Sequence, residues 1–227
     1  MELVASSLWL AQLTSLVLRD PKLRSKTTLL AVFFGLCATQ AEAHAFKSGA
    51  DFYAQFQEGV SVILAYPQTL LPLLALGVLL SLWQPEGLLR VWPMFLAGLV
   101  IGFFAGPLVG TWIVSTTLAV GIATAILAAI LERHSDIETK SLGFGLGFLT
   151  MASSLEGHAF FELPFFIYFG IFLAANMVVA VAAGLTRYAL ERWKQNWMRI
   201  VWRVVASWIA AISLLLIAFA IRQATGG

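Results

Sequence analysis

Five long stretches of the chain contain no Asp, Glu, Lys or Arg: residues 59–85, 91–131, 141–155, 163–186 and 204–221. A helix needs about 20 apolar residues to cross the ~30 Å hydrocarbon core of a bilayer, so these stretches predict membrane-spanning helices. The longest stretch is interrupted by Gly106-Pro107, which predicts a break between two crossings. The expected fold is an all-α integral membrane protein with six transmembrane helices in a compact bundle. The predicted spans are about 59–83, 89–106, 109–131, 140–156, 164–187 and 198–221.

Composition supports this interpretation. The chain is 60% hydrophobic and 11% charged, whereas a soluble domain carries about 25% charged residues. The deficit excludes an ordinary soluble enzyme and a disordered chain. The net charge of +2 comes from 14 basic and 12 acidic residues, so nucleic acid is not an expected partner. The expected partner is the lipid bilayer. A single cysteine, Cys37, excludes an internal disulfide framework.

The N-terminal segment has the pattern of a signal peptide. Residues 19–26 contain four basic side chains, residues 28–36 are mainly apolar, and Ala41-Glu42-Ala43 fits the small-x-small cleavage rule. We therefore expect residues 1–43 to be a signal peptide cleaved after Ala43, with an uncleaved anchor helix as the alternative. The remaining organisation is an extracytoplasmic segment at 44–58, the transmembrane domain at 59–221, and a short outer tail at 222–227.

Cleavage would place His44 outside the cytoplasm and would fix the orientation of every span. The predicted inner loops are then 84–90, 132–140 and 188–199. Together with the adjoining span ends they carry eight basic residues, against two on the outer side. This distribution follows the positive-inside rule. It predicts a multi-pass protein of the bacterial inner membrane with the mature N-terminus and the C-terminus on the periplasmic side.

Small residues and aromatic residues predict how the helices pack and where they end. Glycines and alanines recur at helical spacing in the second, third and fourth spans, which indicates close backbone contacts between helices; they include Gly98, Gly102, Gly106, Gly121, Ala125, Ala129, Gly143, Gly145 and Gly147. Near the last inner loop, tryptophans lie beside basic residues and indicate an anchor at the inner interface; the group is Arg192, Trp193, Lys194, Trp197, Arg199 and Trp202.

The predicted outer side carries the candidate metal chemistry. Glu156, His158 and Glu162 lie between the fourth and fifth spans, and His44 would be the new N-terminal residue. Imidazole and carboxylate together suit divalent transition metals, and a free N-terminal His44 adds an α-amine. Regular structure cannot align all three loop residues, so only a turn could bring them together into a capture site. The alternative is that Glu162, two residues before Pro164, only stabilises the start of the fifth helix.

Apart from tyrosine, the five charge-free stretches contain no ionisable side chain. An ion path would have to use the carbonyls and polar groups near Tyr66, Pro67, Gln68 and Asn176. Tyr66-Pro67 predicts an interruption of the first span, where a kink would expose backbone carbonyls; the alternative is a tolerated helix bend. The alternative for Asn176 is a hydrogen bond to a neighbouring helix. Motifs of metalloproteases, serine hydrolases and phosphate-binding loops are missing from the sequence. We therefore expect neither an enzyme nor a tightly bound cofactor.

The sequence also resembles the HupE/UreJ family of hydrogenase and urease accessory membrane proteins, regarded as nickel or cobalt permeases. The resemblance is carried by AEA followed by HAF, by GHAFFELP at 157–164, by 168–185 and by 121–131. It implies a six-span bundle and a transient divalent metal, Ni²⁺ or Co²⁺. Gly157, His158, Ala159, Glu162, Leu163 and Pro164 match the family's corresponding string.

Several of the family's metal ligands are nevertheless replaced. Tyr66 occupies the position of the histidine in the family's His-Pro pair, the following Asp-His pair is missing from residues 65–72, and Phe160 replaces a second histidine. A glutamate before Gly121 and a histidine late in the fifth helix are also missing. Two hypotheses follow. The protein is either a metal permease or metal-handling accessory protein, or a non-transporting membrane subunit or assembly factor of a larger enzyme complex.

Overall fold

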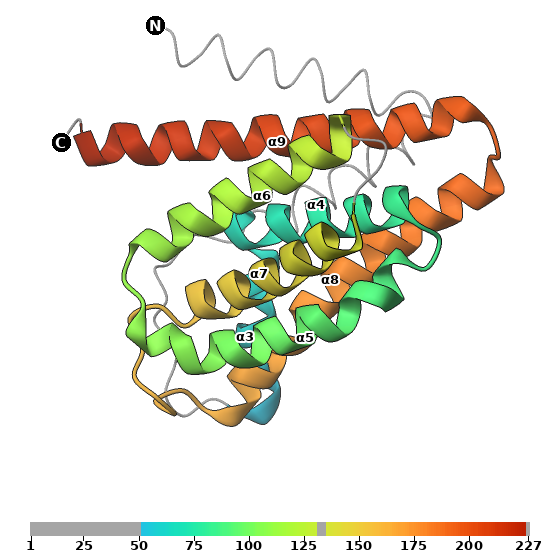
Figure 1. The fold of residues 1–227 in the computed structure, drawn as a ribbon. Helices are drawn as coiled ribbons and strands as arrows, with labels where there is room; N and C mark the ends of the chain where they lie inside the picture. Colours follow the sequence, from blue (N-terminus) through green and yellow to red (C-terminus); the bar gives the residue numbers. More distant parts are fainter. Residues whose placement is uncertain (1–50, 131–134, 226–227) are drawn as a thin grey trace, which may run out of the picture. The chain divides into compact units, whose positions relative to one another are not determined.

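The computed structural model describes residues 51–130 and 135–225, all of which belong to one unit of the chain, Phe46–Gly227 (Figure 1). The predicted signal peptide and His44 lie outside the described residues. The described segments are mainly helical. The elements are α3 (Phe52–Leu64), α4 (Pro67–Trp83), α5 (Gly87–Ala105), the 3₁₀ turn η1 (Gly106–Leu108), α6 (Trp112–Ile130), α7 (Asp136–Ser154), α8 (Phe165–Arg192) and α9 (Asn196–Thr225).

Among the described residues, four helical segments are long and apolar enough to cross a membrane: Gly87–Leu108, Trp112–Ile130, Phe165–Arg192 and Asn196–Phe219. The bent pair α3 and α4 makes a fifth if it is counted as one span. The predicted all-α, multi-pass membrane fold is confirmed at this level. Helix α7 is not among these segments, because Asp136, Glu138 and Lys140 occupy its start and glycine and serine lower the hydropathy of the rest.

The predicted first span is corrected by the structure. Instead of one helix over 59–83, α3 begins at Phe52 and α4 begins at Pro67, with a bend of 71° between them. Proline has no N–H to donate and disfavours a helical conformation in the residue before it. Tyr66 is accordingly extended, with φ −103° and ψ 109°. The predicted interruption at Tyr66-Pro67 is therefore confirmed, and it is sharper than a bend within a single helix.

Helices α5 and α7 lie side by side and approach each other through glycines (Figure 1). A Cβ built on Gly98 of α5 would lie 2.1 Å from the carbonyl oxygen of Phe144 in α7. A Cβ on Gly147 of α7 would lie 2.3 Å from the carbonyl oxygen of Phe95 in α5. The predicted close contact is confirmed, except that Gly145 has no neighbour within 4 Å on its Cβ side.

Helix α8 is the other centre of packing, because it contacts both α3 and α4. Gly59 of α3 faces Gly170 of α8, and a Cβ on either glycine would lie 3.1 Å from the Cα of the other. The space between the helices is filled by fully buried aliphatic side chains, including Leu73, Leu76 and Ile171. Helix α9 covers α6 and part of α4 and leaves most of its own surface exposed.

Candidate functional site

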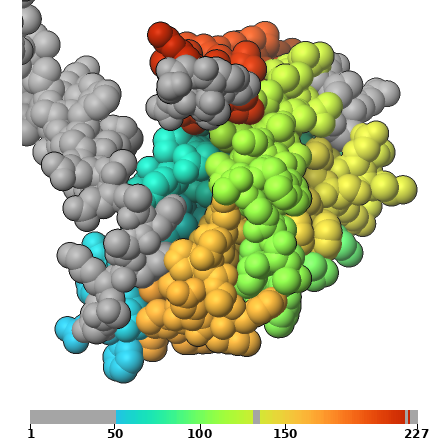
Figure 2. Space-filling model, turned by 90° about the vertical axis from the view of Figure 1, so that its left-hand side faces the viewer, coloured from blue at the N-terminus to red at the C-terminus, as the bar shows by residue number. Residues whose placement is uncertain are grey.

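The predicted capture residues lie in the connection between α7 and α8. Figure 2 looks at this end of the described unit and shows the connection, in orange, beside the green segments that include the α5–α6 turn. The connection reverses direction with two left-handed residues, Gly157 at φ 79° and Phe161 at φ 56°. Glycine adopts this conformation without a steric cost, whereas Phe161 adopts it at some expense in backbone energy. These two residues therefore provide left-handed turns in the connection between α7 and α8.

The polar groups of this loop bond mainly to the loop itself. The amide of His158 donates to the carbonyl of Leu155 at 3.2 Å, and its Nδ1 lies 3.1 Å from the carbonyl oxygen of Glu156. The Glu162 carboxylate accepts a 2.7 Å hydrogen bond from the amide of Ala159. Glu162 thus stabilises the turn that precedes α8, which is a structural role close to the alternative considered from sequence.

Glu156, His158 and Glu162 are not assembled into a three-ligand centre. Within residues 51–130 and 135–225, no three His, Cys, Asp or Glu side chains lie close enough together to hold a metal ion. The expectation that a turn would bring the loop ligands together is therefore not met by these residues alone. The fourth predicted ligand, His44, lies outside the described residues, and its part in a metal site stays a prediction.

Aromatic rings surround the loop, and sequence reasoning did not identify them as part of the site. Phe103 of α5 contacts Phe161 and Tyr168 edge-on, with ring centroids 5.8 Å and 5.0 Å apart. The hydroxyl of Tyr168 accepts a 3.2 Å hydrogen bond from the amide of Leu163. His158 lines a shallow hollow with these rings. In the sequence, the aromatic-rich string at 160–169 indicates that rings gather near this loop, but it does not reveal that Phe103 is their neighbour.

At the break between α3 and α4, the hydroxyl of Thr69 lies among three backbone carbonyls. Its Oγ1 is 3.1 Å from the oxygen of Val62, 3.3 Å from that of Ile63 and 2.9 Å from that of Tyr66. Four oxygen atoms therefore converge where α3 ends and α4 begins. Pro67 and Gln68, both predicted as ion-path residues, lie in the first turn of α4 at this break.

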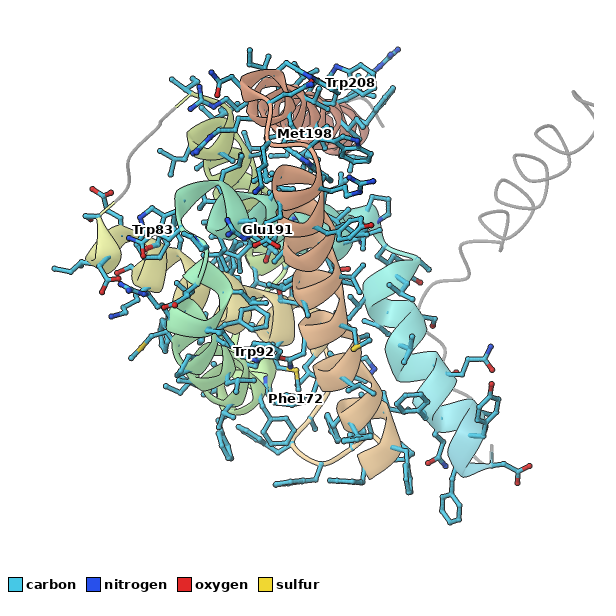
Figure 3. All side chains as sticks on the ribbon, turned by 90° about the vertical axis from the view of Figure 1, so that its right-hand side faces the viewer. Trp83, Trp92, Phe172, Glu191, Met198 and Trp208 are labelled. Atoms are coloured by element: carbon cyan, nitrogen blue, oxygen red, sulfur yellow. The ribbon has the colours of Figure 1, made fainter. Side chains whose placement is uncertain are left out.

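Asn176, the fourth residue predicted for the ion path, forms a hydrogen bond between helices. Trp92 of α5 donates its Nε1–H to Asn176 Oδ1 at 2.9 Å, and Asn176 Nδ2 donates to the carbonyl of Phe172 at 2.8 Å. Figure 3 shows Trp92 and Phe172 on neighbouring helices in this region. The interpretation of Asn176 as an interhelical hydrogen-bonding residue is therefore confirmed.

Most other polar side chains in the interior bond to backbone carbonyls. Ser81 of α4 donates to Ala183 of α8 at 2.7 Å, and Thr124 donates to Val120 of its own helix at 2.8 Å. Within the part of the chain that the structure describes, the hydroxyl of Thr150 and the indole N–H of Trp202 are buried without a hydrogen-bond partner. At the α3–α4 break, by comparison, the hydroxyl of Thr69 lies within hydrogen-bond distance of three carbonyl oxygens.

Comparison of the chain with known protein families, with curated proteins and with solved structures found no match.

Proposed function

We propose that the protein is a multi-pass protein of the bacterial inner membrane that handles a divalent transition-metal ion. Nickel or cobalt is the metal implied by the resemblance to the HupE/UreJ family. In this proposal α7 is the fourth of six crossings, both mature termini are periplasmic, and His44, Glu156, His158 and Glu162 receive the ion on the outer side.

The observation that supports the proposal best is the break between α3 and α4. Discontinuous helices in transporters bring backbone carbonyls to an ion path at membrane depth. Here three carbonyls and the Thr69 hydroxyl converge within residues 62–69. The break overlaps residues 65–72, where the resemblance places the family's metal motif. Neutral oxygen ligands bind a borderline divalent metal weakly, which suits passage of the ion more than storage.

A second candidate function is a non-transporting membrane subunit or assembly factor of a larger membrane enzyme. It is favoured by the dense interior, where glycines bring helices into backbone contact and leucines such as Leu76 and Leu99 are fully buried. It is also favoured because the loop ligands are not assembled into one centre. This function predicts a stoichiometric complex with a larger membrane protein after gentle solubilisation.

Uptake of labelled Ni²⁺ into liposomes that contain the purified full chain tests the first proposal. Thr69→Val removes the hydroxyl at the break and keeps the side-chain volume. Its matched control is Thr124→Val, since Thr124 is also buried but bonds only within α6. We expect saturable uptake that Thr69→Val lowers about tenfold, the effect of one lost polar contact of about 1.4 kcal/mol.

His158→Ala should lower uptake at low metal concentration more than at saturation, because it removes a capture group and leaves the path unchanged. Wild-type uptake no faster than in empty liposomes would refute the transport proposal, and equal loss in the two threonine variants would refute an ion path at the α3–α4 break. Recovery of a stoichiometric partner in that case would support the second function.

A further inference from the structure

A polar cleft opens at the other end of α8, where α4 ends and α9 begins. Its volume is about 350 Å³, and it is lined by Ser81, Leu82, Trp83, Gln84, Pro85, Arg187, Leu190, Lys194, Gln195, Asn196 and Arg199. Figure 3 labels Trp83 and Glu191 in this region. Helix α8 has 28 residues and is therefore about 42 Å long, so the cleft and the His158 loop lie at opposite ends of it.

Three cationic side chains line the cleft, and one carboxylate offsets them. Arg187 donates its Nε–H to Glu191 at 2.6 Å, and Arg199 donates an Nη2–H to the carbonyl of Leu82 at 2.9 Å. These contacts hold the two guanidinium groups at the wall. Lys194 forms no hydrogen bond or ion pair with any residue that the structure describes. The four side chains together leave two positive charges around the cleft.

Aromatic side chains place this end of the bundle at the depth of lipid headgroups. Trp193 and Trp197 follow α8 and begin α9, and each is about half exposed, at 49% and 50%. Tryptophan concentrates at the membrane–water interface because its ring is apolar and its N–H is polar. Basic pockets between transmembrane helices bind the phosphate groups of anionic lipids, and guanidinium groups match the geometry of phosphate oxygens.

We propose that this cleft is a binding site for the phosphate headgroup of an anionic phospholipid. Lys194 and the remaining N–H groups of Arg187 and Arg199 would contact the phosphate, while the lipid tails would lie along the exposed apolar surface of α9. The proposal is independent of metal transport, because it uses none of the residues assigned to capture or passage.

Native mass spectrometry of the full chain in detergent tests the proposal by titration with phosphatidylglycerol, cardiolipin and zwitterionic phosphatidylcholine. The informative variant is Lys194→Gln, because this lysine bonds to no other described residue. Its matched control is Arg192→Gln, an exposed cation two positions away that does not line the cleft. We expect the wild type to prefer the anionic lipids, and Lys194→Gln to bind them about fivefold more weakly, while Arg192→Gln binds as the wild type does.

Inorganic phosphate provides the second arm, because a soluble anion would use the same chemistry without tails. Equal binding of anionic and zwitterionic lipids by the wild type would overturn the proposal. An equal loss of affinity in the two variants would overturn it as well, since it would indicate a diffuse surface charge. Displacement by millimolar inorganic phosphate with no preference among the lipids would assign the cleft to a soluble phosphate and refute the lipid site.

Discussion

Replacing Gly147 by alanine would place a methyl group against the backbone of α5. The new Cβ would lie 2.3 Å from the carbonyl oxygen of Phe95 and 3.2 Å from the amide nitrogen of Leu99. A carbonyl within a helix cannot move independently of that helix. Helices α5 and α7 would therefore have to separate by about 1 Å to restore ordinary van der Waals contact.

Gly145→Ala is a control from the same helix, because a Cβ there meets nothing within 4 Å. Each substitution gains about 0.5–1 kcal/mol from the preference of alanine for helices, so this term cancels between the two variants. The remaining difference is the overpacking cost at Gly147, which is about 1–3 kcal/mol in tightly packed interiors. Gly145→Ala should be as stable as the wild type or slightly more stable.

Reversible unfolding in mixed micelles of a mild detergent and sodium dodecyl sulfate measures this difference. We expect Gly147→Ala to unfold at lower dodecyl sulfate than the wild type, with the free energy of unfolding about 1–3 kcal/mol below that of Gly145→Ala. Equal stability of the two variants would show that α5 and α7 are not in backbone contact, and would refute the packing described for them.

Three further substitutions test single contacts. Asn176→Leu removes the bond to Trp92 and should lower the free energy of unfolding by about 0.6–1.7 kcal/mol in the same assay; an unchanged value would argue against this interhelical bond. Ser135→Ala removes one half of the capping box at the start of α7 and should destabilise this helix end by about 1 kcal/mol. Amide exchange over 136–139 should become faster, and unchanged exchange would contradict the prediction. Tyr168→Phe removes the acceptor for the Leu163 amide and should speed exchange of that amide, with no effect at Ala159.

The helical segments could be predicted from sequence because a bilayer tolerates few charges over about 20 residues. The same rule could not indicate where the first helix begins. Gln55, Gln57 and Glu58 are polar or charged, yet they belong to the helix that begins at Phe52. Pro67 indicates where the interruption lies. The angle of 71° depends on how α3 and α4 pack against α8 and on how α4 packs against its other neighbours.

The partners of the glycine stripes and the shape of the loop could not be predicted. A stripe of small residues indicates a close contact without naming the helix that makes it. The positions of His158 and Glu162 depend on left-handed backbone at Gly157 and Phe161, and the second of these is not expected for phenylalanine. The basic cleft combines residues from 81–85 with residues from 187–199, so no local pattern could indicate it.

The contact between Gly59 and Gly170 has a consequence for the order in which the protein is made. About 110 residues separate the two glycines, and a ribosome adds about 5–20 residues each second. Roughly 6–22 seconds therefore pass between the synthesis of α3 and that of the part of α8 that covers the glycine face of α3. During that interval α3 lacks its packing partner α8. A chain arrested before residue 165 should consequently be recognised by membrane quality-control proteases, while a chain that extends through α8 should escape them.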